Sequence, residues 1–262
     1  MSQFIKQYGA RRTGTNLLRA MLQINCPNCN VLMHILGDKH QKPIDFNQLR
    51  DELRSGANAL EKIKQVTNLR RAETTDLNER SQNTYIDEAS CGLAEAIKNR
   101  QVFILISIKH PYAWGHSIMK WFGYQQAKKH APYQASEYLK SLATACHQFN
   151  HNYAAWLNLA EELPDRALVV QHEKLLQDQA SVFFDICKVL NLPRPASFTA
   201  VSGIVFPTHW DNEPTEVHYL PFNHAYYTNK NYLAALTEPE LAVIKNTIDW
   251  ELMRQFGYDS AI

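Results

Sequence analysis

Apolar residues along this chain fall into two patterns, short continuous runs and stripes with helical spacing. The longest continuous run, residues 101–108, is rich in β-branched side chains, which is typical of a strand buried on both faces of a parallel sheet. Shorter runs predict three further strands, at residues 4–8, 30–36 and 167–171. Helical spacing predicts helices at residues 14–25, 45–54, 88–99, 135–162, 174–190 and 239–256, and one more after Pro111.

Strands that alternate with helices indicate an α/β fold. We expect three layers, α/β/α, with a central parallel sheet, in a single domain that spans residues 1–262 and has a helical insertion at about 45–99. In such a sheet, ligands bind at the carboxyl ends of the strands. The cationic and imidazole residues that follow predicted strands should therefore share one rim: Arg12, Lys39, His40, Lys109 and His172.

The segment between the first strand and the first helix has the features of a phosphate-binding loop. Gly9 and Gly14 have the G-x-x-x-x-G spacing of a P-loop, and a strand–loop–helix turn directs backbone N–H groups at an anion. A P-loop continues with Lys and Ser or Thr, but Thr15 and Asn16 stand there instead. The cations, Arg11 and Arg12, lie inside the loop.

A second candidate anion site follows the buried strand at 101–108. Lys109 leaves the strand, Pro111 starts the next helix, and Ser117 comes eight residues after the lysine. A cation at the strand end and a hydroxyl two helical turns later could hold one phosphate together.

These motifs resemble those of sulfotransferases that use 3′-phosphoadenosine-5′-phosphosulfate (PAPS). The family's first motif, [K/R]-[S/T]-G-T-[T/S/N], is similar to residues 12–16, and the continuation through residue 22 looks like the tyrosylprotein and bacterial branches. The second motif, R-D-P-x-x-x-x-x-S, corresponds to residues 109–117, with Lys in place of Arg and His in place of Asp. Residues 169–176 resemble the strand ending in R-Y-E-D-L more weakly, and the end of the chain also looks like bacterial members.

The resemblance implies a P-loop-like sulfotransferase fold and a role for each motif. The first motif would hold the 5′-phosphosulfate through Arg11, Arg12, Thr13, Gly14, Thr15 and Asn16, and the second would hold the 3′-phosphate through Lys109 and Ser117. Arg12 would stabilise the leaving group, His40 would be the base, and Lys39 would assist at the sulfuryl group. Alternative bases are His34, Asp38 and Glu88. This chemistry needs no metal ion in principle.

Composition and charge indicate which binding partners and which cellular compartment to expect. A net charge of +1 over 262 residues gives no global reason to expect nucleic acid binding. No apolar run has the length of a bilayer span, and the N-terminus lacks a signal-peptide core, so we expect a cytoplasmic protein. Five cysteines, an odd and scattered set, favour reduced thiols. Cys26 and Cys29 with His34 and His40 have knuckle-like spacing, but a lone C-x-x-C does not predict zinc.

Three functions remain open. The first is PAPS-dependent transfer of a sulfuryl group to a hydroxyl or amine, with carbohydrate, lipid-linked glycan, peptide and small alcohol acceptors all open. The second is a P-loop kinase or NTPase, which the missing lysine at position 15 disfavours. The third is a non-catalytic nucleotide-binding member of the same fold, which the replacements in the second motif keep open. Oligomeric state is not predicted.

Overall fold

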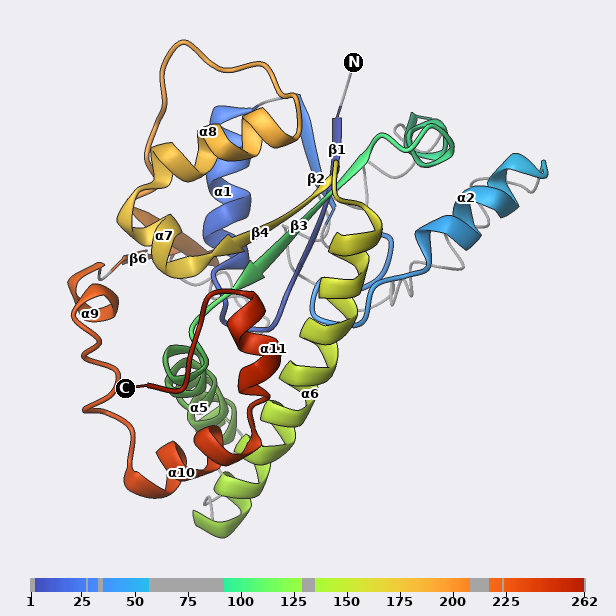
Figure 1. The fold of residues 1–262 in the computed structure, drawn as a ribbon. Coiled ribbons are helices and arrows are strands. Elements are labelled where there is room, and N and C mark those ends of the chain that lie inside the picture. Colours follow the sequence, from blue (N-terminus) through green and yellow to red (C-terminus); the bar gives the residue numbers. More distant parts are fainter. Residues whose placement is uncertain are drawn as a thin grey trace.

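A four-stranded parallel sheet lies at the centre of the molecule (Figure 1). The computed structural model describes residues 3–26, 28–32, 35–56, 92–128, 135–207, 217–222 and 224–261. The strands are β1 (Gln3–Gly9), β2 (Cys29–Leu32), β3 (Val102–Ile108) and β4 (Ala167–Gln171), in the order β2-β1-β3-β4. Parallel pairing of all four confirms the α/β class and the central parallel sheet.

Alternate residues of the strands face two separate cores. Ile104, Ile106 and Ile108 of β3 pack in one hydrophobic cluster, whereas Leu105 belongs to the other, as the period of two requires. The first cluster is covered by α5 (Pro111–Lys128), α6 (Ala135–Glu162), α10 (Glu238–Thr247) and α11 (Trp250–Gln255). The second is covered by α1 (Thr15–Asn25), α7 (His172–Gln177) and α8 (Gln179–Val189). Figure 1 shows these two groups of helices on opposite sides of the sheet, which gives the predicted three layers.

The register aligns the carboxyl ends of the strands. Gly9 at the end of β1 pairs with Ser107 of β3, and Ile108 pairs with Gln171 at the end of β4. The segments that follow β1, β3 and β4 therefore leave the sheet at the same edge. The remaining elements are α2 (Phe46–Arg54), the antiparallel hairpin β5 (Gly203–Pro207) and β6 (Val217–Pro221), and α9 (His224–Thr228).

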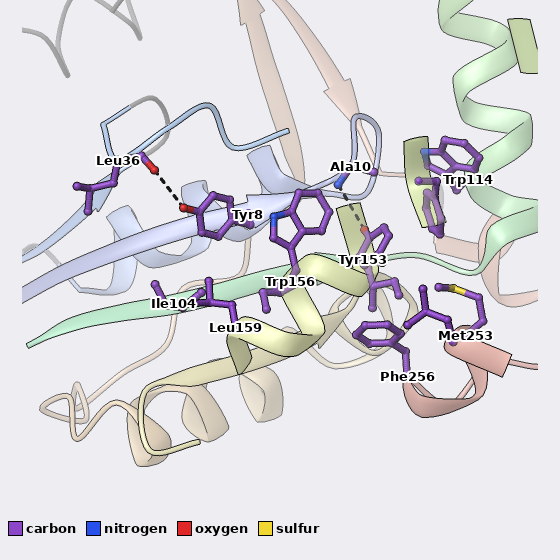
Figure 2. Close-up of a cluster of buried hydrophobic side chains, with 14 of the residues drawn as sticks. Tyr8, Ala10, Leu36, Ile104, Trp114, Tyr153, Trp156, Leu159, Met253 and Phe256 are labelled. Carbon is purple, nitrogen blue, oxygen red and sulfur yellow. Dashed lines mark hydrogen bonds between the residues drawn. The ribbon is translucent and has the colours of Figure 1, made fainter. Parts of the chain in front are cut away.

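Helix α6 supports this edge of the sheet from one face (Figure 2). Trp156 stacks on Tyr8 of β1 with the ring centroids 6.0 Å apart, and both side chains are fully buried. The Tyr8 hydroxyl donates to the Leu36 carbonyl at 3.0 Å, and the Trp156 indole N–H donates to the Gln41 carbonyl at 3.1 Å. These bonds fix the segment that follows β2 against the core.

Several predicted elements differ from the observed ones at their ends. The strand expected at 30–36 ends at Leu32, and residues 33 and 34 lie outside the described part. The helix expected at 174–190 is divided at Asp178, whose carboxylate accepts a hydrogen bond from the Ser181 N–H and starts α8. The helix expected at 239–256 is divided at Asp249 in the same way. Of the helical insertion predicted at 45–99, α2 and a helix at 92–98 are described, and residues 57–91 are not.

The prediction of reduced thiols is wrong for one pair of cysteines. Cys26 and Cys29 form a disulfide in the turn between α1 and β2. The turn brings their Cα atoms to 5.5 Å, which is within the range that a disulfide spans. Cys146 and Cys187 are free and buried, and Cys91 lies outside the described residues. Among the described helices, none combines the length and apolar character needed to span a bilayer.

Candidate anion-binding site

The loop after β1 leads directly into the N-terminus of α1. Gly14 is the N-cap, with φ 85° and ψ 14°, and no side chain caps the helix. The first N–H groups of a helix have no acceptor within the helix, and within the described part of the chain no side chain accepts from those of α1. These donors and the positive end of the helix dipole are therefore available to an anion.

Two glycines allow the backbone to follow this path. A Cβ on Gly14 would lie 2.3 Å from the His172 Nδ1, and its left-handed φ is one that other residues rarely adopt. A Cβ on Gly9 would lie 2.8 Å from the Ser107 carbonyl oxygen. Arg12 also has a left-handed backbone, with φ 71°, which is a strained conformation for a residue with a side chain. The loop keeps its shape because its surroundings impose it.

Hydrogen bonds from beneath hold the loop in place. The Thr13 hydroxyl donates to the Ala10 carbonyl at 2.7 Å. The Ala10 N–H donates to the Tyr153 hydroxyl at 3.4 Å (Figure 2). That hydroxyl donates to the Ser107 carbonyl at 2.6 Å. The Trp114 indole N–H donates to the Arg11 carbonyl at 3.0 Å. These bonds fix the backbone of the loop, so the N–H groups at the start of α1 are held in place and would not have to reorganise to bind an anion.

The two arginines of the loop are exposed to solvent. The Arg11 guanidinium lies over the Trp121 ring, 5.2 Å from its centroid. Arg12 lies close enough to the end of β3 for its charge to lower the pKa of Lys109. The positive charge of the loop therefore acts on the ammonium that follows β3.

Lys109 is a buried cation at the end of β3, with 2% of its surface exposed. Its Nζ donates to the Ser117 hydroxyl at 2.8 Å, and that hydroxyl donates to the Ala113 carbonyl. The Tyr227 ring of α9 lies 4.0 Å from the same Nζ. Burial lowers the pKa of Lys109 to about 7, the Glu173 carboxylate opposes this shift, and Arg12 adds to it.

Lys39 and His40 make hydrogen bonds at the two ends of the loop. The Gly9 N–H donates to the Lys39 carbonyl at 2.9 Å, and the His40 Nδ1 is 2.6 Å from the Gly9 carbonyl. The Lys39 Nζ donates to the Asn16 side-chain oxygen at 3.1 Å, at the start of α1. The Asn152 amide of α6 donates to the His40 carbonyl at 3.0 Å. The first three contacts hold the segment after β2 against the two ends of the loop at residues 10–14, which joins β1 to α1 and is named the anion loop, and the fourth joins this segment to α6.

The tautomer of His40 follows from its partner. Because a carbonyl oxygen only accepts, the bond to Gly9 places the proton on Nδ1 and leaves Nε2 as the acceptor. Burial and then the charge of Lys39 lower the pKa of His40 to about 3, so the imidazole is neutral near pH 7. A neutral imidazole whose Nε2 has no partner among the described residues has the form that a general base requires, although its basicity is low.

Among the alternative bases, only one lies in the described part of the chain. The Asp38 carboxylate accepts from the His40 N–H at 2.7 Å and so shapes the turn that carries the imidazole. His34 and Glu88 lie outside the described residues.

Three residues that the sequence did not assign to the site hold its loops in place through hydrogen bonds: Tyr153, Asn152 and Lys6. Tyr153 and Asn152 come from α6, more than 100 residues away from the loops that they bind, and nothing in their local sequence indicates this role. The sequence does contain a signal for Lys6, because a lysine within a predicted buried strand indicates a buried, hydrogen-bonded cation. It is fully buried, and its Nζ donates to the Gly37 carbonyl at 2.5 Å, which anchors the segment before His40.

Comparison with known proteins finds similarity only among solved structures. No protein-family model and no curated protein sequence matches the chain. A sulfotransferase domain from the olefin synthase of Synechococcus PCC 7002 matches with 16% identity and a TM-score of 0.44, over 98% of this chain and 94% of that one. A sulfotransferase domain from the curacin biosynthetic pathway matches with 13% identity and a TM-score of 0.44, over 99% of both chains. At this level of likeness, function has to be inferred from the residues of the site.

Proposed function

We propose that this protein transfers a sulfuryl group from PAPS to a hydroxyl or amine of an acceptor. The observation that carries the proposal is that two candidate anion sites follow neighbouring strands at one edge of the sheet. The anion loop follows Gly9, Lys109 follows β3, and the register sets Gly9 opposite Ser107. A nucleotide with a phosphate at each end of its ribose has the charge distribution that such a pair would bind.

The residues present fit this donor. The uncapped N-terminus of α1, with Arg12 and Lys39 beside it, would hold the 5′-phosphosulfate, and Lys109 with Ser117 would hold the 3′-phosphate. When bound, PAPS supplies an activated sulfuryl group whose leaving group is 3′,5′-adenosine bisphosphate. Arg12 is exposed at the loop, where its fixed charge would stabilise the negative charge that develops on the leaving phosphate.

His40 would accept the proton of the acceptor. As a bond forms between the acceptor oxygen and the sulfur of the donor, the bond from that sulfur to the bridging oxygen would break, 3′,5′-adenosine bisphosphate would leave, and the proton of the acceptor O–H would pass to the His40 Nε2. The low pKa of His40 in the protein without donor opposes this proton transfer. However, the cations that lower this pKa, Lys39 and Arg11, would be neutralised by the anionic donor, so we expect the pKa of His40 to rise when the donor is bound.

One observation favours a second candidate, a protein that binds the nucleotide without transferring sulfate. A histidine with a pKa of about 3 is a poor base at pH 7, and burial is the largest cause of that shift. If donor binding does not raise the pKa of His40, the chain retains the two anion sites but lacks an effective proton acceptor.

Binding and transfer measurements separate these functions from one another and from a kinase. Calorimetric titration with 3′,5′-adenosine bisphosphate and with ATP, each with and without Mg²⁺, should show metal-independent binding of the bisphosphate and weaker binding of ATP. Transfer of ³⁵S from labelled PAPS to hydroxyl and amine acceptors should follow for an enzyme. Tighter, Mg²⁺-dependent binding of ATP would contradict the proposal, and bisphosphate binding without transfer to any acceptor would favour the non-catalytic candidate.

A further inference from the structure

The ammonium of Lys109 has only neutral partners in direct contact. The Ser117 hydroxyl and the Tyr227 ring are its recorded contacts, and within the described part of the chain no carboxylate forms an ion pair with it. A lysine ammonium has three N–H donors, and one of them is used by Ser117. The buried side chain therefore has donors and charge that an incoming anion could satisfy.

The acid that acts on Lys109 is occupied elsewhere. One oxygen of Glu173 accepts from the His110 N–H at 2.9 Å, and the other accepts from the Tyr258 hydroxyl at 2.5 Å. Its charge raises the pKa of Lys109 from a distance, but burial, Arg12 and Lys120 all act in the opposite sense. The balance leaves the ammonium poorly compensated in the free protein.

Several other groups surround Lys109, and their states matter for what happens near neutral pH. The charged and titratable groups facing it are Arg12 from the anion loop, His116 and Lys120 from α5, His172 and Glu173 from α7, and Tyr226 and Tyr227 from α9. Burial lowers the pKa of His116 to about 4 and that of His172 well below its usual value. Both imidazoles are therefore neutral near pH 7, where Lys109 itself changes charge.

We propose that Lys109 is a proton-dependent anchor, which holds the 3′-phosphate of the donor only while it is protonated, so that donor binding weakens as pH rises through neutrality. This inference rests on the proposed function. The corresponding motif of the sulfotransferase family has arginine, which keeps its charge at any pH that a folded protein tolerates. The lysine of this chain, enclosed by a hydroxyl and an aromatic ring, would make the same contact conditional.

The size of the effect follows from the protonated fraction. With a midpoint near pH 7, the protonated fraction of Lys109 falls about tenfold between pH 6 and pH 8. Binding that requires the protonated form should weaken in proportion. Phosphate groups of the nucleotide also ionise in this range, so the comparison has to cancel their contribution.

The test is calorimetric titration of 3′,5′-adenosine bisphosphate between pH 6 and pH 8 with the wild type and with Lys109→Arg. The ionisation of the ligand is the same for both proteins. The dissociation constant of the wild type divided by that of Lys109→Arg therefore reports the effect of residue 109 alone. We expect this ratio to rise about tenfold from pH 6 to pH 8. Lys140→Arg is the matched control, because Lys140 is an exposed lysine of α6 that is not among the groups facing Lys109, so this change should leave the wild-type profile unchanged.

A measurement on the wild type alone covers the case in which the arginine does not fit the buried site. With ¹³C-labelled lysine side chains, one resonance should titrate near pH 7 and move to a higher midpoint when the nucleotide is added. Lys6, also buried with a lowered pKa, should not respond to the nucleotide. Parallel binding profiles, or no lysine whose midpoint responds to the nucleotide, would overturn this inference alone. Absence of bisphosphate binding at every pH would overturn the proposed function as well.

Discussion

The anion loop and the Lys109 site begin at neighbouring strand ends, yet they differ in almost every other respect. The loop presents two exposed arginines and an uncapped helix N-terminus. The Lys109 site encloses one cation between a hydroxyl and an aromatic ring. The first has a fixed charge that is open to solvent, and the second has a charge that burial makes costly.

The difference arises in the residues that follow each strand. After β1, Gly9, Gly14 and the left-handed turn at Arg12 carry the chain outward before α1 starts. After β3, only Lys109 and His110 precede α5, which begins at Pro111, so the lysine stays beneath α5 and α9. Two strand ends of one sheet thus carry an open and an enclosed cation, because the local sequence sets the path of each chain segment and α9 contributes the Tyr227 ring that covers Lys109.

The largest effect should come from the open site. Arg12→Ala removes the fixed charge at the leaving group, and we expect sulfuryl transfer to fall about 10³-fold, in line with the loss of a charged group that stabilises a transition state. Initial rates of ³⁵S transfer measure this. Arg11→Ala is the matched control and should cost less, because the Arg11 guanidinium lies over Trp121. Equal losses, or an intact Arg12→Ala enzyme, would remove the assigned role.

The next effect concerns the proton acceptor. His40→Ala should lower turnover about 100-fold, since general base catalysis contributes factors of this order or more. Affinity for 3′,5′-adenosine bisphosphate should change little. The measurement is turnover together with calorimetric binding, and a variant that keeps full turnover would move the role of base to another group, with Asp38 the nearest candidate.

The enclosed site should show a smaller loss when its hydroxyl is removed. Ser117→Ala deletes one neutral partner of Lys109, so the affinity for the bisphosphate should fall about fivefold, as expected for a hydrogen bond worth about 1 kcal/mol. Ser141→Ala is a matched control, because its hydroxyl also donates to a carbonyl four residues earlier in a helix. Similar affinities for the two variants would place the phosphate away from Ser117.

The smallest effect on the site, and one that involves the whole fold, is acid destabilisation. Burial lowers the pKa of His40 to about 3 and those of His110 and His116 to about 4. Between these values and about 6.5, the unfolded chain binds protons that the folded chain does not, so the free energy of unfolding should fall as pH drops through this window. Urea denaturation at pH 7.5, 5.5 and 4.5 measures it. His116→Gln should make the free energy of unfolding depend less on pH. A free energy of unfolding that stays constant or rises on acidification would contradict the assignment of these histidines as neutral in the folded protein.

Sequence patterns predicted the strands because apolar runs are local signals. They predicted the common edge because strands that alternate with helices pair in parallel. The apolar run of β3 and the glycines of the anion loop are local signals, and the register that aligns Gly9 with Ser107 follows from parallel pairing. The breaks at Asp178 and Asp249 were missed because a side-chain cap interrupts a helix without interrupting its apolar stripe.

The supporting residues of the site could not be found in this way. Tyr153 reaches Ala10 and Ser107 only after α6 packs on the sheet, and the hydrogen bonds join residues 143 and 46 positions apart. The number and scatter of the cysteines along the chain do not indicate the Cys26–Cys29 disulfide. It depends on the turn between α1 and β2, which brings the two Cα atoms to 5.5 Å. Long-range packing, rather than motif content, determines which polar groups meet at this edge.

The central claim, that two anion sites hold one nucleotide, is tested most directly by comparing 3′,5′-adenosine bisphosphate with adenosine 5′-monophosphate at pH 6.5. In the wild type the bisphosphate should bind about 30-fold more tightly, as expected for charge-assisted hydrogen bonds to the 3′-phosphate. In Lys109→Met this preference should nearly disappear, while binding of the monophosphate should be unchanged. Equal binding of the two nucleotides by the wild type, or a preference that persists without Lys109, would contradict the account.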